Sequence, residues 1–170
     1  MAVASNAVAN RARSRGDDVG DYDTTLMVAA FDEETGVLDY GYVGDGGIVV
    51  AYDDHALELL EYPQKGLDDS STYALTNPSM WRFGRRDSVS SFMVVTDGVL
   101  NALVEEGTWA LDETVADLLC GPIPDEDHLD HYFGANLADA AESPVAGVVD
   151  DRSVFICWSS VAEGGGRKVL

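Results

Sequence analysis

The sequence has little of several features, and each shortage excludes a class of protein. It holds 2 cysteines in 170 residues, too few for a disulfide framework, and its N-terminus lacks the basic start and apolar core of a signal peptide. No apolar run approaches the roughly 18 residues that a membrane-spanning helix needs. We therefore expect a cytoplasmic protein that has no membrane partner.

Basic residues are also scarce. There are 10 lysines and arginines against 31 acidic residues, which gives a formal net charge of −21. Binding to nucleic acid or to an anionic membrane begins with Lys or Arg neutralising phosphates, so we expect neither partner. The simplest explanation of the charge is a solvated acidic surface. Because carboxylates also bind hard cations, only spacing and context can mark a true metal site in such a chain.

Motifs for nucleophilic catalysis are missing as well. The chain has no Gly-x-Ser-x-Gly elbow, which would present a nucleophilic serine. Neither Cys120 nor Cys157 has a basic or histidine neighbour in the sequence to lower the pKa of its thiol. A serine or cysteine nucleophile is therefore not expected.

The remaining composition, 46% hydrophobic and 24% charged, is that of a folded globular protein. We predict one partial domain over residues 1–170, with its core at about 21–159 and a frayed tail at 160–170. Strands grouped before helices favour an α+β fold built on antiparallel sheets. Apolar runs and alternation predict strands at 24–31, 37–43, 48–52, 57–62, 71–75, 89–95 and 153–158, and helices at 2–15, 99–104, 112–119 and 125–141.

Three of these segments carry a more detailed expectation. The strand at 24–31 is nearly all apolar, which predicts burial on both faces. Gly44-Asp45-Gly46-Gly47 is expected to be a hairpin turn in an antiparallel meander, because it lies between two strands. Residues 76–87 are irregular in pattern, and we expect a mobile loop there. Its Arg82, Arg85 and Arg86 would either guide a phosphorylated substrate or simply be surface charge.

Two aspartates share one design, in which an apolar strand delivers a carboxylate at its end. Asp97 follows the strand at 89–95, and Asp150 precedes the strand at 153–158. If those strands are neighbours, both carboxylates can face the same hard cation. A pair of cations about 3.5 to 4 Å apart could then activate a water and clamp a phosphate for hydrolysis. Taken alone, Asp97 is more simply explained as a turn residue or a helix cap, and Asp150 as part of a solvated turn.

Several short segments, in order, resemble the bacterial branch of the metal-dependent protein phosphatase 2C family. They are Asp21-Tyr22-Asp23-Thr24-Thr25-Leu26, Gly44-Asp45-Gly46, Tyr62-Pro63-Gln64-Lys65-Gly66, Thr72-Tyr73-Ala74-Leu75-Thr76, Thr96-Asp97-Gly98-Val99 and Asp150-Asp151-Arg152-Ser153-Val154. The resemblance covers about residues 21 to 159. It implies an antiparallel β-sandwich flanked by helices, a two-metal centre of Mn²⁺ or Mg²⁺, and phosphorylated proteins as substrates.

The resemblance also assigns roles to individual residues. It implies that Asp97 and Asp150 bind metal directly, and that Asp151 supports the loop or a metal-bound water. Asp21 lies near the place where some family members hold a weaker third ion.

One part of the family pattern has no counterpart in this sequence. Family members begin with a longer segment that carries an acidic ligand and an aspartate that bridges both metals, and neither is found before Thr24. We therefore expect the C-terminal two-thirds of a domain with about half of the metal ligands. Three functions remain open: a phosphoserine and phosphothreonine phosphatase, a non-catalytic binding or regulatory module that a second polypeptide completes, and an acidic cation-binding protein.

Overall fold

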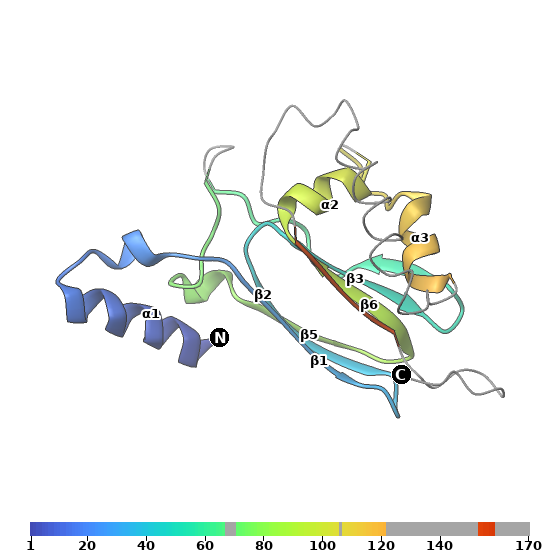
Figure 1. Cartoon of the computed structure of the whole chain (residues 1–170), viewed down its shortest axis with the longest axis horizontal. Coiled ribbons are helices and arrows are strands. Elements are labelled where there is room, and N and C mark those ends of the chain that lie inside the picture. Colours follow the sequence, from blue (N-terminus) through green and yellow to red (C-terminus); the bar gives the residue numbers. More distant parts are fainter. Residues whose placement is uncertain (67–70, 106, 122–152, 159–170) are drawn as a thin grey trace, which may run out of the picture. The chain divides into compact units, whose positions relative to one another are not determined.

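The computed structural model describes residues 1–66, 71–105, 107–121 and 153–158, which form two compact units (Figure 1). The first unit comprises Met1–Asp45 and Glu61–Asp87, and the second comprises Gly46–Leu60 and the described residues from Ser88 onward. Each unit contains one antiparallel sheet. In the described part of the chain, no helix combines the length and the apolar character needed to cross a bilayer.

The first unit is a helix followed by a three-stranded sheet of order β1-β2-β5. The predicted helix at 2–15 is confirmed, and it ends at Gly16 because that residue takes a left-handed φ of 76°. Arg13 and Arg15 lie in its last turn, where positive charge is favourable. The elements of this unit are α1 (Ala2–Arg15), η1 (Val19–Tyr22), β1 (Leu26–Asp32), β2 (Val37–Val43), η2 (Pro78–Met80) and β5 (Arg82–Arg86).

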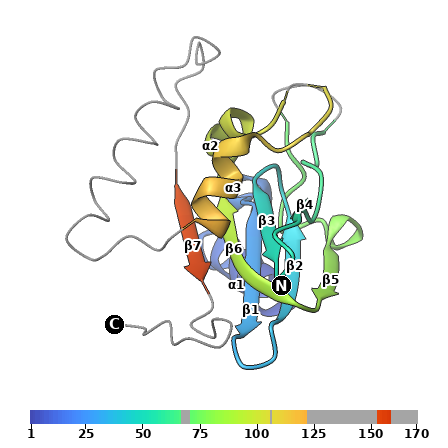
Figure 2. The same cartoon turned by 90° about the vertical axis from the view of Figure 1, so that its right-hand side faces the viewer.

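The second unit is a four-stranded sheet of order β4-β3-β6-β7, with two helices on one face (Figure 2). Its elements are β3 (Gly47–Tyr52), β4 (Leu57–Leu59), β6 (Val89–Val95), α2 (Asp97–Leu103), α3 (Glu113–Cys120) and β7 (Val154–Trp158). The strands predicted at 37–43 and 89–95 have the observed bounds. The expected fold class, α+β with antiparallel sheets, is confirmed by the two sheets.

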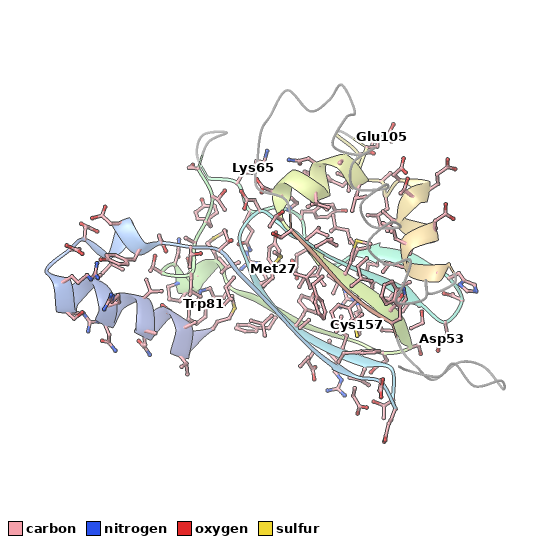
Figure 3. All side chains as sticks on the ribbon, in the orientation of Figure 1. Met27, Asp53, Lys65, Trp81, Glu105 and Cys157 are labelled. Atoms are coloured by element: carbon pink, nitrogen blue, oxygen red, sulfur yellow. The ribbon has the colours of Figure 1, made fainter. Side chains whose placement is uncertain are left out.

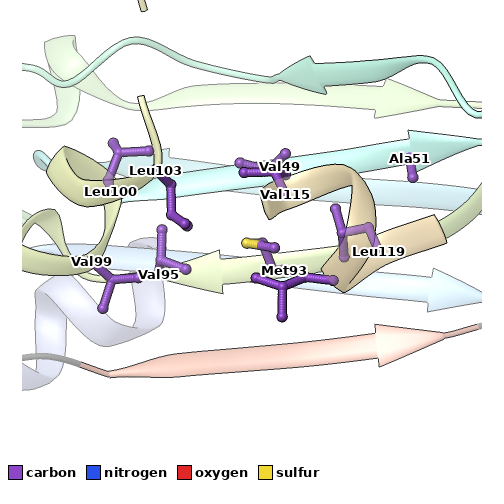
Figure 4. Packing of buried hydrophobic residues seen from close by; sticks show 10 residues of the cluster. Val49, Ala51, Met93, Val95, Val99, Leu100, Leu103, Val115 and Leu119 are labelled. Atoms are coloured by element: carbon purple, nitrogen blue, oxygen red, sulfur yellow. The ribbon is translucent and has the colours of Figure 1, made fainter. Parts of the chain in front are cut away.

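The core of the second unit lies between its sheet and the two helices (Figure 4). Val49 of β3 and Met93 of β6 pair across the sheet and are fully buried. Leu100 and Val115 cover them from α2 and α3, and both are also fully buried. Burying a side chain of this size contributes about 1.5 to 3 kcal/mol. This packing fixes α2, and with it the residues at its start, against the sheet.

The helix predicted at 112–119 is present as α3, and its start is capped by a side chain. Asp112 is the N-cap residue, and its carboxylate accepts a hydrogen bond from the backbone N–H of Thr114 at 2.8 Å. The hydrogen bond from the Thr114 side chain, followed by that from the Thr114 backbone, lowers the pKa of Asp112 below its ordinary value. The ionised carboxylate is therefore the form that caps the helix.

Replacing Asp112 by alanine is expected to lower the free energy of unfolding at pH 7 by about 1 kcal/mol, since an N-cap side chain is lost. Because the folded-state pKa is lowered, this contribution is complete above the unfolded pKa of about 3.9 and disappears as pH falls through the folded value. Urea titrations of both proteins at pH 7 and at decreasing pH would test it. A constant difference across that range would contradict the assignment.

The predicted hairpin at Gly44-Asp45-Gly46-Gly47 is wrong. β2 pairs with β1 on one side and β5 on the other, while β3 pairs with β4 and β6. Both edges of each strand are therefore occupied, and β2 and β3 belong to different sheets. Gly44 has a φ of 133°, and a Cβ atom there would lie 2.5 Å from the side chain of Thr25. Glycine is therefore needed where the chain passes the Thr25 side chain. Because β2 and β3 do not pair, the predicted meander is also wrong.

The expected burial of both faces of the first strand is also wrong. β1 is an outer strand of its sheet, and along it partly buried residues alternate with exposed ones. Val28, for example, is 44% exposed. The predicted strand at 71–75 is reduced to a single bridge between Lys65 and Thr72. The predicted helix at 125–141 and the tail at 160–170 lie outside the described residues.

The segment expected to be a mobile loop contains a regular strand. β5 pairs with β2 from Leu38↔Arg86 to Tyr42↔Arg82. Gly84 makes room for the ring of Tyr40, since a Cβ atom at Gly84 would lie 2.4 Å from it. Trp81, just before β5 (Figure 3), donates its indole N–H to the carbonyl of Leu75 at 3.0 Å. Charged side chains are common on outer strands, which explains why the pattern did not read as a strand.

Candidate metal centre

Strand β6 carries Asp97 to one edge of the second unit's sheet. The strand is apolar and largely buried up to Val95, Thr96 follows, and Asp97 is the first residue of α2. Asp97 is half-buried. A carboxylate in the first turn of a helix is favoured by the positive end of the helix dipole. The prediction that an apolar strand ends at this aspartate is confirmed.

Strand β7 begins at the same edge. β6 and β7 pair antiparallel, with Val95 opposite Val154. The backbone N–H of Thr96 donates to the carbonyl of Ser153 at 3.1 Å, so the pairing continues one residue beyond β6. The condition on which a shared site depends, that the two strands are neighbours, is therefore met. Asp150 and Asp151 themselves lie outside the described residues.

Strand β3 also starts at this edge, on the other side of β6. Gly47 is its first residue and pairs with Val95. A Cβ atom at Gly47 would lie 2.8 Å from a methyl group of Leu100, so glycine allows α2 to approach the sheet closely. The start of β3, the end of β6 and the start of β7 therefore lie side by side, with Asp97 at their common edge.

The chemistry of the donors at this edge suits a hard cation. Carboxylate oxygens are the ligands that Mg²⁺, and Mn²⁺ with it, prefer in proteins. Within residues 1–66, 71–105, 107–121 and 153–158, no group of three or more His, Cys, Asp or Glu side chains could hold a metal ion. Asp97 is thus one carboxylate of a candidate centre, and the described residues do not supply a complete ligand set.

In the first unit, the Gly44-Asp45 segment is held by side chains that the sequence analysis did not single out. The backbone N–H of Gly44 donates to the side-chain oxygen of Gln64 at 3.2 Å, and the Gln64 backbone N–H donates to the Gly44 carbonyl at 2.8 Å. The hydroxyl of Thr72 donates to the carboxylate of Asp45. In the sequence, Gln64 and Thr72 were distinguished only by lying in segments that resemble the family.

Tyr42 is a further buried support of the same segment. Its side chain is fully buried, and its hydroxyl donates to the Gly44 carbonyl at 2.9 Å. Burial, with the negative charges of Asp45 and Glu61, raises the pKa of Tyr42 well above its ordinary value. The phenol therefore remains protonated and acts as a donor.

The three candidate substrate-guiding arginines lie on β5, and alternate residues of a strand face opposite sides. Arg82 and Arg86 share one face, and Arg85 lies on the other. Arg85 forms ion pairs with Asp39 at 3.3 Å and Asp87 at 3.7 Å. The structure therefore does not place all three on one side of the strand.

Arg82 and Arg86 both have contacts within the first unit. The Arg82 guanidinium donates to the carbonyls of Ser79 at 3.3 Å and Trp81 at 3.2 Å. The Arg86 guanidinium carbon lies 5.9 Å from the centre of the Tyr40 ring, which is within range of a cation–π interaction. These contacts hold both side chains close to their own strand and its neighbours.

Asp21 is the last candidate that the structure describes, and Cys120 is considered with it. Asp21 is an exposed residue of η1 in the first unit, whereas Asp97 belongs to the second. Burial raises the pKa of the Cys120 thiol, which makes it a poorer nucleophile at neutral pH.

Comparison with solved structures finds phosphatases. A bacterial serine phosphatase matches with a TM-score of 0.61 and 16% identity, covering 97% of this chain and 67% of that one. The serine/threonine phosphatase Stp1 from Staphylococcus aureus gives 0.59 and 17%, covering 94% and 64%. The phosphatase domain of SpoIIE from Bacillus subtilis gives 0.50 and 9%, covering 84% and 61%. At these identities the likeness establishes the fold.

The chain spans from 61% to 67% of the length of these three structures. A search of curated proteins gave no match. The family model for Protein phosphatase 2C matches residues 1–128, which is well over half of the chain and includes Asp97, the end of β6 and all of the first unit. On that match, this chain belongs to the protein phosphatase 2C family.

Proposed function

We propose that this chain is a metal-dependent protein phosphatase that hydrolyses phosphoserine and phosphothreonine, with Mn²⁺ or Mg²⁺ as its cofactor. Family membership supports phosphatase chemistry. The observation that carries the metal dependence is the place of Asp97, which follows Thr96, the residue that extends the pairing of β6 with the start of β7. Two strand ends that meet at one edge allow carboxylates from both to serve one centre.

In this proposal, a carboxylate oxygen of Asp97 binds the cation, and Asp150, three residues before Ser153 in the sequence, supplies a second ligand. Asp151 supports the adjoining loop, and Asp21 contributes to a weaker ion. When bound, the metal supplies an activated water and neutralises charge on the phosphate. The packing of α2 on the sheet holds Asp97 in place, so that no reorganisation of its backbone is needed when the metal binds.

The arginines of β5 are proposed to guide the phosphorylated substrate. Arg85 is the best placed of the three, since 60% of its side chain is exposed. Its ion pairs with Asp39 and Asp87 are also exposed and therefore weak, so a phosphate dianion can compete for the guanidinium. Arg pairs with phosphate through two parallel hydrogen bonds, which suits this role.

A titration of the purified chain with Mn²⁺ tests the proposed function. Turnover of an aryl phosphate is expected to rise from zero with added Mn²⁺ and to return to zero with excess chelator. Inorganic phosphate release from a phosphothreonine peptide would extend the result to the proposed substrate class. Absence of turnover at saturating Mn²⁺ would exclude the activity for this chain.

A non-catalytic binding or regulatory module is the second candidate. The observation behind it is that the described residues do not contain a group of three or more ligand side chains. In that case a second polypeptide would complete the fold. Calorimetry showing Mn²⁺ binding without turnover would favour this candidate over the enzyme.

A further inference from the structure

Thr96 joins β6 to α2, and its backbone carbonyl is used by the helix. The carbonyl accepts hydrogen bonds from the N–H groups of Val99 at 3.1 Å and Leu100 at 2.9 Å. Thr96 is the N-cap residue of α2, a position where a threonine hydroxyl commonly accepts a bond from the first turn. Here the hydroxyl makes no such bond. The hydroxyl instead bonds to a residue outside the helix.

That other partner is Ser153, just before β7. In an antiparallel ladder, a hydrogen-bonded pair exchanges two bonds, each backbone N–H donating to the opposite carbonyl. The Thr96 N–H donates to the Ser153 carbonyl at 3.1 Å as the ladder requires. The return bond cannot use the Thr96 carbonyl, which is turned into α2. The Ser153 N–H donates instead to the Thr96 hydroxyl oxygen at 3.0 Å.

We propose that the Thr96 hydroxyl is a positioning group for the metal centre, because it extends the β6–β7 ladder past the point where β6 becomes a helix. Thr96 is covalently next to Asp97, and Ser153 is the residue through which β7 is reached from Asp150. The hydroxyl therefore ties the residue that precedes Asp97 to the residue that precedes β7. This inference rests on the proposed function, and it assigns no contact between Thr96 and the metal.

The exposure of Ser153 allows an effect on metal binding to be distinguished from an effect on the stability of the fold. Ser153 is exposed, so water can replace a lost partner of its N–H. Removing the hydroxyl is thus expected to change the thermal midpoint little while loosening the start of β7. Mutations of groups that orient metal ligands typically weaken metal affinity by about 10- to 100-fold. We expect a loss of that size.

The test compares Thr96→Val, which keeps the shape but lacks the hydroxyl, with Thr96→Ser, which keeps the hydroxyl. Mn²⁺ affinity is measured without substrate, from the electron paramagnetic resonance signal of free Mn²⁺. Thr96→Val is expected to bind about 10- to 100-fold more weakly, and Thr96→Ser to retain the parental affinity. Thr24→Val is the matched control, since the Thr24 hydroxyl donates to the carbonyl of its neighbour Thr25 at 3.3 Å and lies in the other unit. Hydrogen exchange at the Ser153 amide should be faster in Thr96→Val alone.

The outcomes distinguish this inference from the function on which it rests. Unchanged Mn²⁺ affinity in Thr96→Val, beside weakened binding in Asp97→Asn, would overturn the role of Thr96 and leave the proposed centre intact. Unchanged affinity in Asp97→Asn, or no Mn²⁺ binding by the parental chain, would overturn both. If Thr96→Val does not fold, Thr96→Ala is compared with Thr96→Ser by the same two measurements. Equal affinities in that pair would also overturn the inference.

Discussion

Replacing Asp97 by asparagine is expected to abolish Mn²⁺-dependent hydrolysis and to weaken Mn²⁺ binding by at least about 100-fold. The lower limit follows because loss of a group that merely orients a ligand already weakens binding by up to about 100-fold. Asparagine has nearly the same size and can occupy the first turn of α2, so the fold should survive. The change removes the negative charge and one of the two carboxylate oxygens. Isothermal titration with Mn²⁺ and aryl phosphate turnover give the two readouts.

Asp112→Asn provides the matched control. Asp112 also stands at the start of a helix in the second unit, and asparagine caps helices as well as aspartate does. The control should therefore retain both Mn²⁺ affinity and turnover. Equal loss in the two variants would mean that the general acidic charge, rather than the edge at which β6 and β7 meet, determines metal binding.

The second large effect is expected at Leu100, one turn into α2 from Asp97. Its side chain is fully buried in the core of the second unit. Leu100→Ala should lower the free energy of unfolding by about 2 to 5 kcal/mol, through lost burial and the cavity left behind. We expect the upper half of that range, because Gly47 faces Leu100 and has no side chain to fill the space. Urea denaturation followed by circular dichroism measures the difference.

Leu100→Met keeps most of the volume and should cost less than about 1.5 kcal/mol. If the alanine variant lost no more than the methionine variant, the packing of α2 on the sheet would not be the source of stability. Because α2 begins at Asp97, the alanine variant should also bind Mn²⁺ more weakly at temperatures where it remains folded. That link would show that the core of this unit holds the candidate centre in place.

The sequence was most informative where a local pattern and the tertiary environment agree. The largely apolar segment from Val89 to Val95 predicted a strand, and the segment at 112–119 predicted a helix, because both signals are local. The neighbouring positions of β6 and β7 were a condition that no local pattern could decide. Strand pairing depends on partners that are distant in the chain, and the structure supplies that information.

The errors have the same origin. Gly44-Asp45-Gly46-Gly47 has the composition of a hairpin turn, but β2 and β3 already have other partners on both edges. β5 was not expected because its arginines and glycine do not alternate with apolar residues, yet a short outer strand tolerates that composition. Thr96 was seen only as the neighbour of Asp97. Its role depends on Ser153, which lies far away in the sequence.

The pairing of Gly47 with Val95 has a consequence for the synthesis of this protein. β3 leaves the ribosome long before β6, and residues 61–87, which belong to the other unit, are made between them. β3 can pair with β4 soon after both are made, but its other edge has no partner until the chain has been extended past Val95. Sheets joined by such distant contacts fold slowly, on a scale of about milliseconds to seconds. During this interval the apolar segment from Ile48 to Ala51 would be accessible to chaperones that bind apolar segments.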